Sequence, residues 1–243
     1  MVSVNPENRY IYFDPIDPAD HKHTLIFNHG LGDTAMGFHG LFLDSGDEYN
    51  LVPPTCRVVL PTAPVQPVTL NGGYQMNSWF DVYPMKHQIS TMDDVHSRYD
   101  QKGLMESVGL ITKIVDEEIE RLDGKSSSVW LGGFSQGCTL SLATFLLYPE
   151  KQLGGALGLS GILALKLKDW NKEVDLELKK KSQIFLYHGR QDPMIPCDSA
   201  LLSYGLLDCC DIKYSLTVEE RLEHSISMRE IQKISKFFHK HMI

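Results

Sequence analysis

The sequence has few of the features that mark a membrane, secreted or nucleic-acid-binding protein. No stretch approaches the ~20 apolar residues of a transmembrane helix, and residues 1–6 lack the charged and apolar regions of a secretory signal. The formal net charge is −8, and the densest basic run is the short segment 179–181, so nucleic-acid binding is not expected. We therefore expect a cytoplasmic protein without stable membrane insertion.

Cysteine is also scarce, with five residues at irregular spacing. An odd number that includes the vicinal pair Cys209 and Cys210 is a poor disulfide framework, which indicates reduced thiols. The histidine pairs at 21 and 23 and at 239 and 241 lack nearby partners in a ligand spacing. Neither a metal nor another cofactor is expected.

The composition is that of one globular domain. With 243 residues, 42% hydrophobic and 22% charged, the chain is large enough for a single core over residues 1–243, and residues 1–23 are interpreted as an N-terminal extension. Apolar runs alternate with helical or loop stretches, which predicts an α/β fold with a mostly parallel central sheet and helices on both faces. The strands are expected at 24–28, 56–60, 129–132, 155–159, 184–188 and 212–218, and the helices at 104–122, 138–148 and 228–242.

The most informative motif is Gly133-Phe134-Ser135-Gln136-Gly137, between an apolar run and a helical one. Glycines on both sides of the serine allow a sharp strand-to-helix turn that a Cβ would obstruct. Such a turn presents a serine hydroxyl at a helix N-terminus, so Ser135 is the candidate nucleophile. Cys138 lies one helical turn further on and is an alternative nucleophile, although burial is the simpler interpretation.

A serine nucleophile needs a base and a carboxylate that orients the base. Asp192 follows the predicted strand at 184–188, where a turn residue before Pro193 is the alternative interpretation. His224 lies in the loop between the strand at 212–218 and the last helix. His239 and His241 compete for the base, but they lie inside that helix and loops at strand ends more often carry chemistry.

An oxyanion hole is expected from two backbone amides. One follows the nucleophile, at Gln136, and the other lies in the glycine-flanked turn after the first predicted strand, at Leu31. Residues 66–84 are rich in proline, glycine and aromatic residues and are interpreted as a flap beside the active site, with a packed surface loop as the alternative.

The motifs together resemble those of the acyl-protein thioesterase and lysophospholipase-like carboxylesterase family of α/β-hydrolases. The resemblance covers about residues 24–242 and rests on HGLGD at 29–33, PTAPVQPVT at 61–69, SWFD at 78–81, GGFSQG at 132–137, HGRQDPMIP at 188–196 and the HS pair at 224–225. It implies a cofactor-free serine hydrolase of the α/β-hydrolase fold that acts on an acylated protein, a small acyl ester or a lysophospholipid. It also implies that Trp79 and Met194 line the acyl channel. The resemblance is compatible with a homodimer as well as with a monomer.

The chain departs from the family pattern at three places. Cys138 stands where a second glycine is common, Arg190 where an acidic or small residue is common, and the charged run 219–223 replaces a glycine-containing turn before His224. These differences bear on substrate preference more than on the chemistry. A ligand-binding protein that keeps the fold without turnover is the alternative from another functional class.

Overall fold

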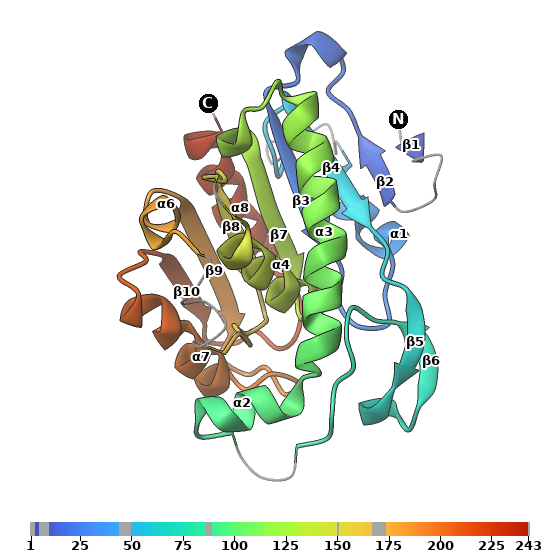
Figure 1. Ribbon diagram of the computed structural model, residues 1–243, viewed down its shortest axis with the longest axis vertical. Coiled ribbons are helices and arrows are strands. Elements are labelled where there is room, and N and C mark those ends of the chain that lie inside the picture. Colours follow the sequence, from blue (N-terminus) through green and yellow to red (C-terminus); the bar gives the residue numbers. More distant parts are fainter. Residues whose placement is uncertain are drawn as a thin grey trace.

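The computed structural model describes residues 3–4 (backbone), 10–43, 50–85, 89–149, 151–166 and 174–242. Its centre is an eight-stranded sheet in the order β1-β2-β4-β3-β7-β8-β9-β10 (Figure 1). The strands are β1 (Ser3–Val4), β2 (Tyr10–Phe13), β3 (His23–Asn28), β4 (Cys56–Pro61), β7 (Val129–Phe134), β8 (Gly155–Leu159), β9 (Gln183–Gly189) and β10 (Ser215–Glu219).

In the sheet order from β4 to β10, every pair of neighbouring strands is parallel. At the other end of the sheet, β2 pairs antiparallel with both β4 and β1. The predicted fold class, an α/β-hydrolase fold with a mostly parallel sheet, is confirmed. Within the predicted N-terminal extension, β2 continues the sheet as an antiparallel strand between β1 and β4 that was not predicted. Four residues are too few to show a clear alternation of apolar and polar side chains.

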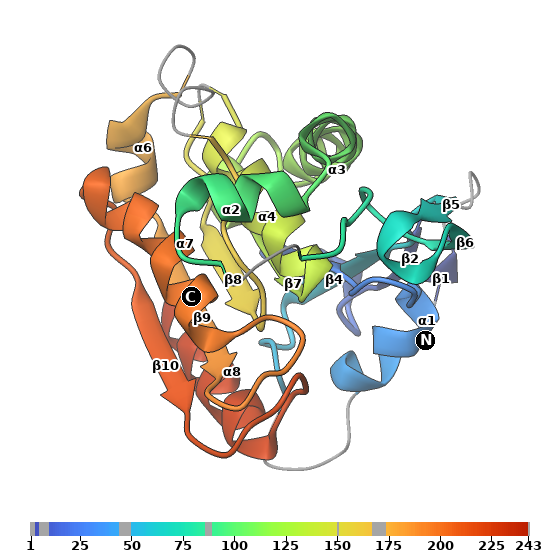
Figure 2. The same cartoon turned by 90° about the horizontal axis from the view of Figure 1, so that it is seen from below.

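Two groups of helices cover the two faces of the sheet (Figure 2). Alternate residues of β3 show the division, since Ile26 packs into the core beneath α3 and α4, and Leu25 and Phe27 pack into the core beneath α8. The helices are α1 (Ala35–Phe38), α2 (Met92–Arg98), α3 (Gln101–Arg121), α4 (Gln136–Leu147), α6 (Leu176–Lys180), α7 (Cys197–Cys209) and α8 (Met228–His241). Both faces of the sheet are therefore buried, as parallel sheets require.

The last strand begins later than predicted. The run from Ile212 was expected to be strand, but β10 starts at Ser215. Asp211 has a positive φ of 54°, and the Ile212 N–H donates to Leu207 O at 3.0 Å, which closes the end of α7. Ile212 is buried because it packs beside this helix end, so its hydrophobicity reflects a cap and not a strand.

The predicted flap contains a hairpin outside the main sheet. Strands β5 (Val65–Val68) and β6 (Tyr74–Asn77) pair antiparallel, and Gly72 and Gly73 take positive φ values at the turn. The Gly32 N–H donates to Asn77 O at 2.8 Å, so the hairpin is fixed to the loop after β3.

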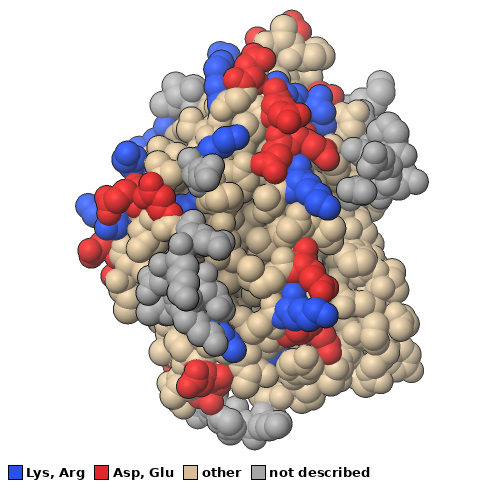
Figure 3. All heavy atoms as spheres, in the orientation of Figure 1, with Lys and Arg blue, Asp and Glu red and all other residues tan. Residues whose placement is uncertain are grey.

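The surface carries charges of both signs. On the face that shows α3, Lys and Arg lie interspersed with Asp and Glu over tan surface (Figure 3). None of the helices in the described ranges has the length and apolar character needed to span a bilayer.

Candidate active site

Ser135 lies at the sharp turn between β7 and α4. Its φ of 55° and ψ of −117° are strained for a residue with a side chain, and its N–H donates to Leu159 O at 2.8 Å. The glycines of the motif are required by contact distances. A Cβ on Gly133 would lie 2.3 Å from Gly137 O, and one on Gly137 would lie 2.0 Å from Asn28 O.

Three predicted residues, distant in the sequence, meet at the carboxyl end of the sheet. The distance from Ser135 Oγ to His224 Nε2 is 2.9 Å, and from His224 Nδ1 to Asp192 Oδ2 it is 2.7 Å. The Asp192 side chain is fully buried. Serine, imidazole and carboxylate thus form one continuous chain of hydrogen bonds, and its order matches a general-base arrangement.

The carboxylate of Asp192 is held in its ionised form. Burial by itself raises the pKa of this group, but hydrogen bonds from His224 and from the Ile195 N–H outweigh burial, and the pKa lies below its ordinary value. Asp192 Oδ1 accepts from the N–H groups of Met194 and Ile195 at 2.9 and 2.8 Å. These two amides orient the carboxylate toward His224.

A second histidine, which the sequence reasoning did not single out, lies behind the carboxylate. His188 is fully buried at the end of β9, with Nε2 3.5 Å from Asp192 Oδ2 and 2.9 Å from Ile195 O. Burial lowers its pKa, the largest effect on that group, so the ring is neutral near pH 7. Its position at the end of a buried strand was the available signal.

The two predicted oxyanion donors face the same cavity. Leu31 and Gln136 both line it, and within the described residues neither backbone N–H has a hydrogen-bond acceptor. The Leu31 loop is held from behind by His29. Because the Ala63 N–H donates to His29 Nε2 at 3.0 Å, the proton must lie on Nδ1, which donates to Gly30 O at 2.7 Å.

The side chain of Gln136 has a role that its backbone position did not predict. Its Oε1 accepts from the Trp79 N–H at 2.9 Å, and its Nε2 donates to Ser78 Oγ at 3.0 Å and to Phe80 O at 2.7 Å. All three partner residues are buried. One amide therefore joins the first residue of α4 to the segment that follows the hairpin.

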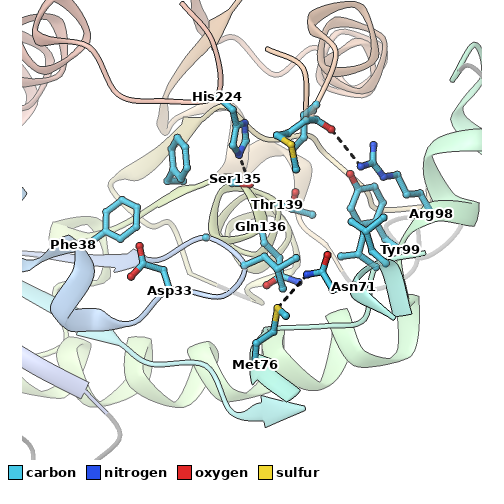
Figure 4. Close-up of a pocket in the computed structure, with 17 residues that line it drawn as sticks. Asp33, Phe38, Asn71, Met76, Arg98, Tyr99, Ser135, Gln136, Thr139 and His224 are labelled. Carbon is cyan, nitrogen blue, oxygen red and sulfur yellow. Dashed lines mark hydrogen bonds between the residues drawn. The ribbon is translucent and has the colours of Figure 1, made fainter. Parts of the chain in front are cut away.

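The hydroxyl of Ser135 opens into a cavity of about 300 Å³ (Figure 4). Met194 is among the residues that line it. Leu70, Asn71, Met76 and Val82, which belong to or adjoin the predicted flap, form another part of the wall. The apolar residues give this wall the character that an acyl chain requires.

Trp79, which was expected to contact the acyl group, is not among the residues that line this cavity. The residue is 2% exposed, and its indole Nε1 donates to His29 O at 2.9 Å. Its ring lies 5.1 Å from the His29 ring, between centroids. Trp79 instead supports the loop that carries Leu31, and a buried indole needs such a hydrogen-bond acceptor.

The competing candidates do not approach the hydroxyl. Cys138 is fully buried, and burial raises the pKa of its thiol to about 12, so it is protonated at neutral pH. His239 Nδ1 lies 2.9 Å from Ser235 O on an exposed part of α8. In the described part of the chain, no three side chains of the metal-binding types come together as ligands.

The comparisons with known proteins agree on one family. The family model described as Phospholipase/Carboxylesterase matches residues 16–242. Acyl-protein thioesterase 1 homolog 1 of Dictyostelium discoideum is 34% identical over 240 residues, which cover 99% of this chain and 98% of the relative. Acyl-protein thioesterase 1 of Yarrowia lipolytica is 35% identical over 220 residues, 89% of this chain and 90% of the relative.

Solved structures agree in fold. SOBER1 of Arabidopsis thaliana has a TM-score of 0.74 at 28% identity, over 91% of this chain and 99% of its own. Acyl-protein thioesterase 2 of Zea mays has a TM-score of 0.76 at 21% identity, over 97% and 99% of the two chains, which shows the fold alone. With a family match over nearly its whole length, this chain belongs to the phospholipase/carboxylesterase family of α/β-hydrolases.

Proposed function

We propose that this protein is a serine hydrolase that cleaves fatty acyl thioesters or esters through an acyl-enzyme, as an acyl-protein thioesterase does. The observation that carries the proposal is the hydrogen-bonded chain from Ser135 through His224 to Asp192, with distances of 2.9 and 2.7 Å. The names of the two relatives described above support the substrate class. The apolar flap wall beside Ser135 gives an acyl chain a place to bind.

In this mechanism, His224 Nε2 takes the proton of Ser135 as the hydroxyl oxygen attacks the acyl carbonyl. The amides of Leu31 and Gln136 donate to the resulting oxyanion, and each such donor typically contributes ~10²–10³ in rate. His224 then protonates the departing thiol or alcohol. Water, deprotonated by the same ring, attacks the acyl-enzyme and releases the acid and free Ser135.

Asp192 acts through His224. Its ionised carboxylate accepts from Nδ1, which leaves Nε2 available as the base, and its charge stabilises the imidazolium that forms. The two amides that donate to Oδ1 keep the carboxylate oriented toward His224 during the reaction. A neutral His188 behind it adds no competing positive charge.

The five cysteines are free in the structure, which fits activity in a reducing compartment such as the cytoplasm.

A carboxylesterase or lysophospholipase that acts on small esters or lysolipids is the second candidate, and a specific observation favours it. The cavity of about 300 Å³ is at the lower end of the ~300–1,000 Å³ usual for ligand pockets.

Labelling with a fluorophosphonate tests the assignment of the nucleophile. Wild-type protein should be modified on the peptide that contains Ser135, and Ser135→Ala should lose both labelling and several orders of magnitude in acyl-ester turnover while it unfolds at the same temperature. Asp192→Asn should keep part of the labelling and lose on the order of 10³–10⁴ in kcat. Full activity in Ser135→Ala would exclude the mechanism.

A further inference from the structure

Arg98, the last residue of α2, places a buried positive charge on the wall of the active-site cavity. The residue is 8% exposed and lines both this cavity and a neighbouring one of about 660 Å³ beside Tyr83 and Met85. In Figure 4 it lies at the edge of the site, beyond Tyr99 as seen from Ser135. Its guanidinium therefore marks one boundary of the space into which Ser135 opens.

The guanidinium is poorly paired. Nη2 donates one long hydrogen bond, 3.3 Å, to Met194 O, and Nε and Nη1 have no hydrogen-bond partner among the described residues. Over the described ranges, no carboxylate lies within ion-pair distance of Arg98. Asp94, one turn earlier on the same helix, accepts instead from the N–H groups of Ser90 and Thr91.

Such an arrangement is costly for the free protein. A buried charge without a counter-ion loses its hydration, and the Tyr99 ring, whose centroid lies 5.8 Å from Arg98 Cζ, compensates this only in part. A matched anion would pair with the planar guanidinium through two hydrogen bonds. The site is thus incomplete without a negatively charged group.

A second polar atom in the same cavity is also unpaired. Thr139 lies in the first turns of α4, is 1% exposed and lines the cavity, and its Oγ1 has no hydrogen-bond partner in the described structure. Leu70, Met76 and Val82 supply apolar wall in the same cavity. A ligand that fits would therefore combine an apolar chain with a polar, anionic end.

We propose that Arg98 determines substrate specificity by binding a carboxylate at the far end of the acyl group. The preferred substrates are then thioesters or esters in which one carboxyl of a dicarboxylic acid is esterified and the other is free. This inference rests on the proposed function and names the acyl class for the same site. Arg98 supplies the counter-ion, Thr139 supplies a hydroxyl donor, and the flap wall contacts the intervening methylene groups.

A neutral acyl chain of the same length meets a different environment. Its terminal methyl would lie against the guanidinium without pairing it, so the cost of the buried charge would remain. A charge-assisted hydrogen bond contributes enough to change affinity by about 10- to 100-fold. Discrimination of that size should appear between a neutral and a carboxylated ester of equal length.

The kinetic test compares p-nitrophenyl hexanoate with the mono-p-nitrophenyl ester of hexanedioic acid near neutral pH. Wild-type protein should show a kcat/KM that is about 10- to 100-fold higher for the carboxylated ester. Arg98→Met should remove this preference through a higher KM and keep kcat/KM for the neutral ester within about threefold. Arg98→Lys should retain part of the preference, and Arg229→Met, which removes an exposed charge on α8, should retain all of it.

Binding to an inactive variant separates this inference from the proposed function. Calorimetric titration of Ser135→Ala with monomethyl hexanedioate and with methyl hexanoate should show tighter binding of the anion, and Arg98→Met in that background should abolish the difference. If wild-type protein hydrolyses neither p-nitrophenyl ester but the anion still binds through Arg98, the proposed function fails and the anion site stands. Equal binding of the two methyl esters to Ser135→Ala overturns the inference.

Thermal unfolding distinguishes specificity from structure. Because Arg98→Met removes a poorly paired buried charge and fills similar volume, its unfolding temperature should match or exceed that of the wild type. A lower unfolding temperature together with an equal loss on both esters would assign Arg98 a structural role and overturn the proposal.

Discussion

Replacement of Gln136 by methionine tests how the elbow and the flap are held together. Methionine keeps the length of the side chain and removes its three hydrogen bonds to Ser78, Trp79 and Phe80. Phe80 O retains the Ser78 hydroxyl at 2.7 Å, so the main uncompensated group is the buried Trp79 N–H. An unsatisfied buried donor costs ~1–3 kcal/mol, and with the lesser losses we expect about 2–4 kcal/mol in the free energy of unfolding.

For a chain of this size ~1 kcal/mol corresponds to ~2–4 °C, so the unfolding temperature should fall by roughly 4–16 °C. Circular dichroism melts and urea titrations with an unchanged m-value measure the effect. The exposed Gln183→Met is the matched control and should change the unfolding temperature little. We also expect kcat to fall, because the Gln136 amide would lose its fixed direction. An unfolding temperature equal to that of the control would refute the reasoning.

Two further predictions concern glycine contacts and pH. Gly137→Ala should lower the free energy of unfolding by more than ~3 kcal/mol, because its Cβ would lie 2.0 Å from Asn28 O. Gly109→Ala in α3, whose Cβ would have nothing within 4 Å, should raise it by ~0.5–1 kcal/mol. Equal urea midpoints for the two variants would contradict this. Burial raises the pKa of Glu230 from 4.5 to about 8. Since the folded pKa is the higher one, the contribution of Glu230 to stability is full below pH ~4.5 and is lost as pH rises to ~8, by at most about 5 kcal/mol. Glu230→Gln should therefore flatten the decline in the free energy of unfolding over that range. An unchanged slope would contradict the assignment.

Much of the fold and the reacting centre could be predicted from the sequence, because their signals are local. The strand before Ser135 is a continuous apolar run, and the flanking glycines are fixed by contacts of 2.0–2.3 Å that admit no side chain. Asp192 and His224 each lie in the loop that follows a strand of the parallel sheet. Parallel strands end at the same edge, so residues distant in the chain had to converge there.

The sequence could not predict contacts that depend on how loops pack. Trp79 and Met194 carry equally apolar signals, yet Trp79 turns toward His29 and Met194 toward the cavity. Arg98 looks like an ordinary charged residue at a helix end. Only the packing of α2 against the segment near Met194 buries its guanidinium.

One side chain joins the catalytic and specificity ends of the cavity. Gln136 fixes residues 78–80 to α4, and the same segment continues to Val82, which pairs with Tyr99, and to Tyr83, whose N–H donates to Arg98 O at 2.8 Å. A short series of hydrogen bonds therefore joins Gln136 to the backbone of Arg98. Because the oxyanion amide and the charge at the cavity edge share this support, the chain can fix the distance between the scissile carbonyl and the far end of the acyl group. A fixed distance is what a site needs to select acyl groups by length and terminal charge together.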